Sequence, residues 1–467
     1  MNKFLKVGLS LLVMLCVASM VFAGGNRNQS SDSGATLRLG IYPEADQGSE
    51  ITMHREFLQK FNEKWPNVTV QPAHFRYQLD TFMPLAQSGR VPTIFETWFT
   101  EIDSLLSGPY VRDITAELKA MGWDTKMNTG IRDLLTRNGK IYGLPRDGYV
   151  LGLHVNAALF RQAGLVDSRG IPQYPKTWAE LAQVAVQIKQ RTGQAGICIL
   201  AKDNAGGWHF SNIAWNFGAT FSRLQGGKYV ANLNSTEVIE ALQYIKDLKW
   251  VHDVLTADPT NEDWGTGWAQ IGTGMAAMLI GAADGVNQPT EVYGMPVSDY
   301  MIAPMPAGPR GQQFSLLGGT FFAFGSTATS AEVTAALNYL SIMGRVPEVN
   351  SDTLVGLMRD ARRRKEAGIP VIPDFPAWTY QPYLDAKQEA IDSFANVDQR
   401  MFADYYTTIA KSGNVRPEEV QAQDLYGELA KCLQAVITDR NADPRALLET
   451  ANRNYQALLD QGVNKGK

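Results

Sequence analysis

Hydrophobic residues alternate with polar ones shortly after residue 35, and the pattern then changes to a helical period. Leu37, Leu39 and Ile41 alternate over residues 36–42, which predicts a strand. Apolar side chains then recur at every fourth position from Met53 to Trp65, which predicts a helix. The folded part of the chain is therefore expected to begin near Ala35.

The next elements continue this alternation. We expect a second strand at residues 68–70, a helix at about 79–88 and a buried third strand at 92–98. Strands and helices in this order predict a parallel sheet covered by helices on both faces. Such sheets bind ligands beyond the carboxyl ends of their strands, so the loops after Tyr42 and after Phe95 are candidate site loops.

A second set of elements follows residue 143. Residues 150–155 and 197–200 read as strands, and Thr177 with Glu180 predicts a capped helix start. From Asp374 to the end the pattern is almost entirely helical. The chain is thus expected to hold two α/β units and a helical C-terminal part.

Composition supports a large globular protein. The 467 residues are 45% hydrophobic and 19% charged, with a formal net charge of −4, which argues against disorder. No basic patch is expected to follow phosphates, so nucleic acid is not an expected partner. Cys198 and Cys432 lie in apolar segments and are interpreted as small buried side chains, although pairing with each other stays open. No cysteine and histidine cluster predicts a metal or another cofactor.

The N-terminus predicts export. Residues 1–23 have two lysines, an apolar run and a small-residue cleavage pattern, as in a secretory signal peptide. A membrane anchor is disfavoured because the run is short for a bilayer span. A lipid anchor is disfavoured because Leu15 precedes Cys16 where a small residue is needed. Residues 24–34 are polar and are expected to form a disordered tether, so we predict a periplasmic protein.

Several segments, taken in order, resemble the carbohydrate-binding extracellular solute-binding proteins of ATP-binding-cassette importers, the group that includes maltodextrin-binding protein. These segments are FNEKWPNV at 61–68, GRVPTIF at 89–95, GKIYGLP at 139–145, NAALFRQAGL at 156–165, PKTWAEL at 175–181, GMAAM at 274–278 and the diglycine 318–319. Thr93 and Val155 depart from the usual pattern, at positions not expected to touch a ligand.

The resemblance implies an α/β, two-lobe periplasmic-binding-protein fold. Its hinged lobes would have mixed, mostly parallel sheets and an extra C-terminal helical insertion at about 374–411. The first lobe would comprise residues 35–146 and 318–344, and the second residues 147–317 and 345–467. Crossings between the lobes would fall near 145–149, 314–319 and 344–350.

A sugar site needs flat aromatic rings for C–H faces and planar polar groups for hydroxyls. In the first lobe, Trp98 follows the third strand where the family places a sugar-facing residue. Glu96 ends an apolar strand, where an acid has little structural reason to lie. Glu44 lies in the first site loop and is either a ligand group or a solvated acid.

The crossings add five candidates. Arg146 and Asp147 either form a salt bridge or act separately, with Asp147 binding hydroxyls and Arg146 meeting a substrate carboxylate of a uronate. Tyr149 follows them. Gly318 and Gly319 either let backbone N–H groups approach the ligand or serve the hinge alone.

In the second lobe, Trp208 follows a diglycine and is the preferred stacking platform, whereas neighbouring His209 is expected to be structural. Asp284 lies where the family often carries a ligand-contacting residue. Trp264 and Trp268 are interpreted as core because they lie four residues apart on an apolar helix face. Trp378 and Tyr380 are expected to pack within their own proline-rich turn.

The expected function is that of a periplasmic receptor that binds a mono- or oligosaccharide, with a uronate as one option, and delivers it to a transmembrane permease. We expect a monomer without catalysis. A secreted glycoside hydrolase, needing only two carboxylates, is the first alternative. A ferric-ion-binding protein is the second, prompted by the neighbouring tyrosines at 405 and 406, and delivery to a membrane sensor instead of a permease also stays open.

Overall fold

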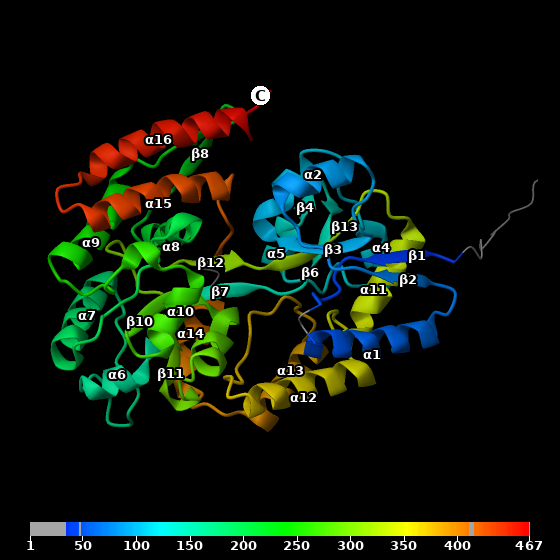
Figure 1. The fold of residues 1–467 in the computed structure, drawn as a ribbon, viewed down its shortest axis with the longest axis horizontal. Coiled ribbons are helices and arrows are strands. Elements are labelled where there is room, and N and C mark those ends of the chain that lie inside the picture. Colours follow the sequence, from blue (N-terminus) through cyan, green and yellow to red (C-terminus); the bar gives the residue numbers. More distant parts are fainter. Residues whose placement is uncertain (1–33, 46–47, 411–414, 467) are drawn as a thin grey trace, which may run out of the picture.

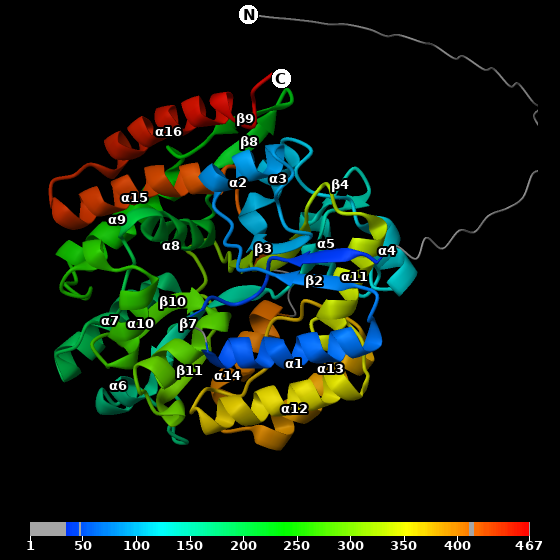
Figure 2. The same ribbon diagram turned by 45° about the vertical axis from the view of Figure 1, so that its right-hand side comes forward.

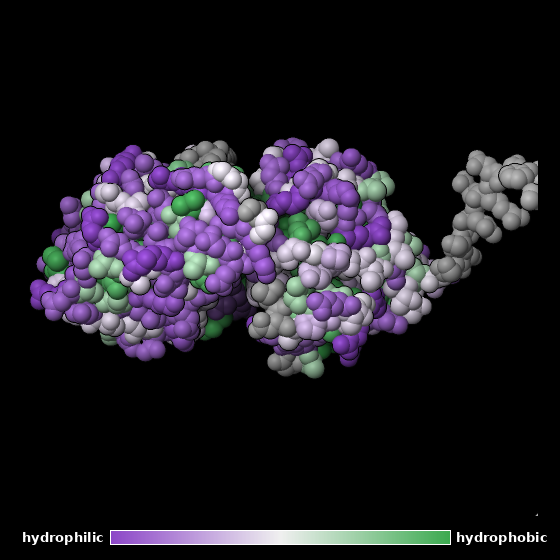
Figure 3. Space-filling model, turned by 90° about the horizontal axis from the view of Figure 1, so that it is seen from above, coloured by the Kyte–Doolittle hydropathy of each residue, from purple (hydrophilic) through white to green (hydrophobic). Residues whose placement is uncertain are grey.

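The computed structural model describes residues 34–45, 48–410 and 415–466 and divides them into two lobes (Figure 1). Seen from above, the molecule is two rounded bodies with a waist between them (Figure 3). Each lobe has its own large cluster of buried apolar side chains, one built around Leu39, Phe95 and Phe322 and the other around Leu153, Ile197 and Ile280. The expected two-lobe α/β fold is confirmed. The expected signal peptide and nearly all of the tether lie outside the described residues.

The first lobe contains the elements predicted from the N-terminal pattern and a later return of the chain. Its elements are β1 (Thr36–Leu39), α1 (Gly48–Lys64), β2 (Thr69–Pro72), α2 (Leu79–Gln87), β3 (Ile94–Trp98), η1 (Phe99–Glu101), α3 (Ile102–Leu106), α4 (Thr115–Met121), α5 (Thr129–Leu134), β4 (Thr136–Arg137), β5 (Lys140–Ile141), β6 (Gly143–Pro145), β13 (Thr320–Phe324) and α11 (Ser330–Ile342). Leu37 and Leu39 are fully buried, as the alternation requires.

The second lobe takes up the middle and the end of the chain. Its elements are β7 (Tyr149–Asn156), α6 (Ala157–Gln162), α7 (Trp178–Thr192), α8 (Asp203–Asn216), β8 (Ser222–Gln225), β9 (Lys228–Ala231), α9 (Thr236–Trp250), η2 (Pro259–Asn261), α10 (Trp264–Gly272), β10 (Met278–Ala282), η3 (Ala283–Val286), η4 (Gln288–Val292), η5 (Val297–Asp299), β11 (Tyr300–Ala303), β12 (Ser315–Gly318), α14 (Arg400–Tyr405), η6 (Tyr406–Ala410), β14 (Val415–Arg416), α15 (Ala422–Thr438) and α16 (Pro444–Gln461). Thr177 caps α7 by accepting a hydrogen bond from the Glu180 amide, as predicted.

Both sheets mix parallel and antiparallel strands. The first has the order β2-β1-β3-β13-β6, and β1 is parallel to β2 and β3. The second has the order β10-β7-β12-β14, with β11 also paired to β7. The expectation of mostly parallel pairing is wrong among the described strands, because β7, which leads the chain into the second lobe, pairs antiparallel with β10, β11 and β12. On its return the chain also pairs β13 antiparallel with β3 and β6.

Two crossings connect the lobes side by side. The chain leaves the first lobe between β6 and β7 and returns where β12 continues into β13 (Figure 1). Leu317 and Gly318 of β12 pair with Val150 and Tyr149 of β7, so the two crossing segments are hydrogen-bonded to each other. This arrangement brings the residues of both crossings to the waist between the lobes.

Helices α12 (Ser351–Glu366) and α13 (Gln381–Phe394) follow the expected boundary near residue 344. They lie beside α1 in both ribbon views (Figures 1 and 2), and Asp352 pairs with Lys60 of α1 at 2.9 Å. Trp378 and Tyr383 belong to the first lobe's buried cluster, whereas Ile369 and Ile372 pack into the second. These contacts favour a first lobe that includes both helices, and the position of the third crossing stays a prediction.

The two mature cysteines are separate buried thiols, as interpreted from the sequence. No helix within the described ranges has the length and apolar character that a bilayer span requires.

Candidate ligand-binding site between the lobes

A salt-bridge cluster occupies the first crossing. Nη1 of Arg146 lies 2.6 Å from Oε2 of Glu96, and Nε of the same guanidinium lies 2.9 Å from Oδ2 of Asp147. The alternation of β3 turns Glu96 and Trp98 to one face, while Phe95 and Thr97 are buried. The structure therefore brings three sequence-predicted residues together, and it favours the salt-bridge interpretation of Arg146 and Asp147.

Asp147 also connects the crossing to Trp98. Its Oδ1 accepts a hydrogen bond of 2.9 Å from the amide of Thr320, and Thr320 is the partner of Trp98 in the β3 and β13 pairing. Trp98 is 52% exposed, although indole rings of this size are usually well buried. An exposed ring at the carboxyl end of a parallel strand, next to a fixed carboxylate, is suited to stack on a ligand.

The diglycine at the second crossing is required by packing. A Cβ atom on Gly318 would lie 2.3 Å from the ring of Tyr149, and one on Gly319 would lie 2.6 Å from Phe99 and 2.8 Å from the carbonyl oxygen of Asp147. Gly319 also has a φ of +154°, which L side chains rarely adopt. Both glycines thus serve the close approach of the two crossing segments.

Carboxyl groups from three parts of the chain act electrostatically on Tyr149. Burial, followed by the charges of Glu418, Asp284 and Asp147, raises the pKa of Tyr149 well above its ordinary value. Asp284 lies in η3, after β10, and is solvent-accessible. Desolvation by the surrounding protein, followed by the charge of Asp147, raises the pKa of the Asp284 carboxyl group to about 6. Asp284 stays a predicted site residue, as the sequence resemblance implied.

Glu418, which the sequence reasoning missed, lies in the same neighbourhood. Its carboxyl group accepts hydrogen bonds from Tyr426 and Trp208, and burial next to Glu419 raises its pKa to about 8. It lies between β14 and α15, in a segment with no motif. Only an acid pair after a proline, at 417–419, could have drawn attention to it.

Trp208 has a different role from the one expected. The diglycine before it lies inside α8 rather than in a loop, because α8 packs closely against α15 and a Cβ on Gly207 would lie 1.9 Å from the Tyr426 carbonyl oxygen. Trp208 is only 6% exposed, and its ring meets the ring of Trp264 edge-on at 4.2 Å between centroids. It supports Glu418 and Trp264 rather than presenting a free face.

Trp264 is the exposed indole of the second lobe. The sequence placed it in the core with Trp268, yet it is 41% exposed at the first turn of α10, whereas Trp268 is buried against Gly281 and Gly285. The interpretation was wrong for Trp264 because the helix begins at that residue, where a side chain can lie beyond the core. Trp264 and Trp98 are thus exposed rings contributed by opposite lobes.

Two further expectations concern structural aromatics. His209 is fully buried, and its Nδ1 accepts a hydrogen bond of 2.9 Å from the amide of Leu200. Burial lowers its pKa to about 3, so it stays neutral. Trp378 is buried in the first lobe's core, and Tyr380 lies under the ammonium of Lys126 at 4.3 Å from the ring centroid. His209 is structural, as expected, whereas Trp378 and Tyr380 contact the rest of the first lobe and not only their own turn.

With this geometry in view, comparisons with known proteins decide the family. The family model for the bacterial extracellular solute-binding protein matches residues 48–341, more than half of the chain. The chain belongs to this family.

Individual relatives agree with this assignment. An uncharacterized ABC transporter extracellular-binding protein of Pyrococcus horikoshii is 26% identical over 189 residues, which cover 39% of this chain and 40% of the relative. The cyclic alpha-maltosyl-1,6-maltose binding protein of Arthrobacter globiformis has a similar structure, with a TM-score of 0.67, 19% identity and coverage of 92% of this chain and 100% of that one. UgpB of Mycobacterium tuberculosis in complex with glycerophosphocholine has a TM-score of 0.65 at 16% identity, covering 92% and 99%. These structures share the two-lobe fold.

A cavity of about 910 Å³ adjoins the crossing of this solute-binding protein. Its lining includes Glu96 and Arg146 and continues along the loop after β1, near Tyr42, to α12 and α13. Glu44 pairs with His74, a lining residue, at 2.9 Å between Oε1 and Nε2. Glu44 thus lies at the border of the cavity, on the first lobe only.

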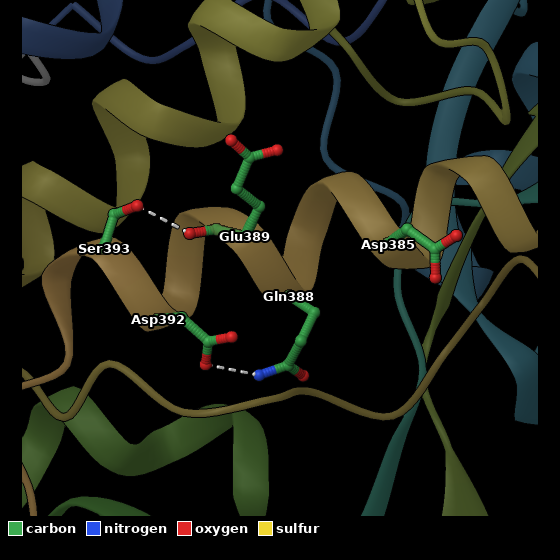
Figure 4. A pocket seen from close by; sticks show the side chains of 5 residues that line it. All are labelled: Asp385, Gln388, Glu389, Asp392 and Ser393. Carbon is green, nitrogen blue, oxygen red and sulfur yellow. Dashed lines mark hydrogen bonds between the residues drawn. The ribbon is translucent and has the colours of Figure 1, made fainter.

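A second depression lies on the outer side of the insertion. Figure 4 shows Asp385, Gln388, Glu389, Asp392 and Ser393 along one face of α13, where Gln388 donates to Asp392. All five residues belong to a single helix and are exposed. This shallow acidic face is a solvated helix surface and not part of the site between the lobes.

The two neighbouring tyrosines that prompted the iron alternative donate hydrogen bonds from their hydroxyl groups to backbone carbonyl oxygens. The Tyr405 hydroxyl donates to the Val150 carbonyl oxygen at 2.9 Å, and the Tyr406 hydroxyl donates to that of Pro373 at 2.6 Å. Among the described residues, no group of three or more histidine, cysteine or acidic side chains is arranged to hold a metal ion. The packing interpretation of this pair therefore accounts for both hydroxyls.

Proposed function

We propose that this solute-binding protein captures a mono- or oligosaccharide between its lobes and delivers it to the permease of an ATP-binding-cassette importer. One observation carries the proposal: the exposed indole of Trp98 ends the strand that holds Glu96, and the carboxylates of Glu96 and Asp147 meet at Arg146 on the crossing between the lobes. Rings and planar acceptors are the groups that a pyranose requires. The extracellular family supports a periplasmic location.

We propose that the two lobes close over the ligand by a hinge motion at the crossings. The first lobe contributes Trp98 and Glu96, and the second contributes Trp264 and Asp284, so a ligand that touches both sets favours the closed arrangement. The ligand shifts the population only by its differential affinity for the closed form. We expect the permease to distinguish the two arrangements, and we expect the receptor to act as a monomer without catalysis.

The uronate option loses support at Arg146. Its guanidinium already faces Glu96 and Asp147, so a ligand carboxylate there would lie next to two anions that share its charge. Among proteins of this fold, one binds a cyclic maltosyl-maltose and another is complexed with glycerophosphocholine. We therefore propose a polyhydroxylated ligand that carries no net negative charge.

Titration calorimetry of the purified mature protein against a panel of saccharides tests the function. The panel pairs glucose, N-acetylglucosamine, glucosamine and glucuronic acid with their β-1,4-linked disaccharides. We expect saturable binding to at least one uncharged or cationic member, a higher melting temperature with it, and no change in the sugar. Binding of glucuronic acid alone would contradict the ligand class, and hydrolysis of the disaccharides would establish the glycosidase alternative instead.

A further inference from the structure

We infer that the ligand is an oligosaccharide longer than a disaccharide, and that its outer rings lie along one face of α12. This inference rests on the proposed function and narrows its ligand class. It starts from the cavity of about 910 Å³ that adjoins the crossing. Glu96 and Arg146 line this cavity at the crossing, and residues of α1, α12 and α13 line it elsewhere. One cavity thus joins the crossing to the three helices beside it.

The part of the cavity along α12 is long. Thr353 and Arg364 both line it, and they lie about 16 Å apart along the helix axis because each residue adds about 1.5 Å. The volume of about 910 Å³ is near the upper end of the range of roughly 300–1,000 Å³ that small-molecule sites occupy. A single pyranose ring would leave most of this space to water. Because affinity increases with the surface that a ligand buries, a longer chain would gain from the remaining wall.

Helices α1 and α12 run in opposite directions along this cavity. Asp352, at the start of α12, pairs with Lys60 in the later part of α1 at 2.9 Å. Arg359, further along α12, pairs with Glu56 in an earlier turn of α1 at 3.8 Å. The C-terminal end of α12 therefore lies on the side of the loop after β1, which leads into α1. A sugar chain that starts at the crossing would reach this end of α12 first and the start of α12 last.

Aromatic rings accompany the polar groups in this cavity. Phe75 lines it and packs edge-on against Phe95, the residue before Glu96, at 5.5 Å between ring centroids. Tyr42, in the loop after β1, adds a second partly exposed ring to the lining. A pyranose beside the crossing can therefore stack on a ring and form hydrogen bonds at the same time.

Helix α12 offers a hydrogen-bond donor to a further ring. Arg364 is half-buried, and among the described residues its guanidinium has neither an ion pair nor a hydrogen-bond partner. The neighbouring Arg363 differs, because it pairs with Asp360 at 3.5 Å. A guanidinium has five N–H donors, and the hydroxyl groups of an uncharged sugar can accept from them. Arg364 is thus placed to bind a ring beyond those held at the crossing.

Calorimetry with oligomers of increasing length tests the inference. The probes are β-1,4-linked oligomers of glucose, of N-acetylglucosamine and of glucosamine, each with one to five rings. In at least one series we expect the tetramer to bind tighter than the dimer by about tenfold or more, which corresponds to about 1.4 kcal/mol. This gain with chain length is the quantity that the variants should change.

A blocking variant links the gain to α12. Gly356 lines the cavity, and no described side chain lies within 4 Å of its Cβ position, so Gly356→Leu would extend into open space. It should reduce the advantage of the tetramer to about threefold or less, which is half of the effect on a logarithmic scale. The matched control is Val355→Leu, because Val355 is 64% exposed and lies outside the cavity lining. This control should keep the full gain.

A second variant keeps the test valid if Gly356→Leu folds poorly. Arg364→Gln shortens the side chain and removes donors, so it should weaken the tetramer more than the dimer. Its matched control is Arg362→Gln, because Arg362 is exposed and lies over the ring of Phe394, at 5.5 Å from the centroid, outside the cavity lining. Thermal melts without sugar show whether each variant is folded.

The outcomes separate the inference from the proposed function. If the tetramer binds no tighter than the dimer in every series that binds, the inference is wrong and the sugar receptor stands. If Gly356→Leu and Arg364→Gln are folded and both keep the full gain, the assignment of the outer rings to α12 is wrong. If no oligomer of any length binds, the proposed function fails and the inference fails with it.

Discussion

Nη1 of Arg146 lies 2.6 Å from Oε2 of Glu96, which joins the end of β3 to the crossing that enters the second lobe. The same guanidinium reaches Asp147, so one cation holds two acids that would otherwise repel each other. The ion pair thus fixes the geometry of the candidate site at the crossing between the lobes.

Arg146→Gln should weaken both the site and the fold. The side chains are about one third exposed, so the lost ion pairs cost about 1 kcal/mol or less in unfolding free energy. Sugar affinity should fall by about tenfold because Glu96 and Asp147 lose their orientation. Calorimetry and thermal denaturation measure the two effects. The control is Arg132→Gln, whose partner Asp133 is exposed and 3.8 Å away, and equal behaviour of both variants would contradict the prediction.

Alanine replacements of two tryptophans should separate binding from stability. Trp98→Ala should lower sugar affinity and leave the melting temperature close to that of the wild type, because the ring is half exposed. Trp208→Ala should lower the unfolding free energy by about 3–5 kcal/mol, because that ring is buried. Chemical denaturation with and without sugar distinguishes them. Wild-type affinity in Trp98→Ala would remove this ring from the site.

Gly207→Ala should destabilise the contact between α8 and α15. The new methyl group would lie 1.9 Å from the Tyr426 carbonyl oxygen, so the helices would have to separate. Gly356→Ala in α12 is the matched control, because nothing lies within 4 Å of its Cβ position and alanine gains about 0.5–1 kcal/mol of helix propensity. The melting temperature should therefore fall in Gly207→Ala and rise in Gly356→Ala. Equal melting temperatures would show that α8 is not tightly apposed to α15.

Glu418 predicts a pH dependence of stability. Burial raises its pKa to about 8, so its contribution to stability is complete below the ordinary pKa of a glutamate and is lost as the pH rises through about 8. Glu418→Gln cannot ionise and should keep more of its stability between pH 6 and pH 9 than the wild type. Urea denaturation across this range measures the difference. Parallel curves for the two proteins would contradict the raised pKa.

Much of the first lobe could be predicted because short periodic segments report directly on burial. Leu37 and Leu39 alternate and are buried, and the strand ending at Trp98 leaves Glu96 and Trp98 on the accessible face. Arg146 and Asp147 directly follow a β-strand at the crossing, which the resemblance placed in order. For these residues the local sequence is sufficient because the neighbouring strand fixes where the side chain lies.

The second lobe's contribution depended on contacts between distant segments. Gly206 and Gly207 resemble a flexible loop in the sequence, whereas they are helical glycines required by the approach of α15. Trp264 fits an apolar helix face, but its position at the first turn of α10 exposes it. Glu418 joins the site only because α15 packs on α8. Local patterns do not encode such pairings over more than two hundred residues.

The strand order of the first sheet has a consequence for biosynthesis. Because β13 lies between β3 and β6, the first sheet is incomplete until residues 146–319 have been made. A nascent chain that ends before Thr320 leaves unpaired backbone groups along both β3 and β6, which are open to a wrong partner. The ribosome thus completes the earlier sheet only after it has made the middle part of the later body, while α14, α15 and α16 are still to come.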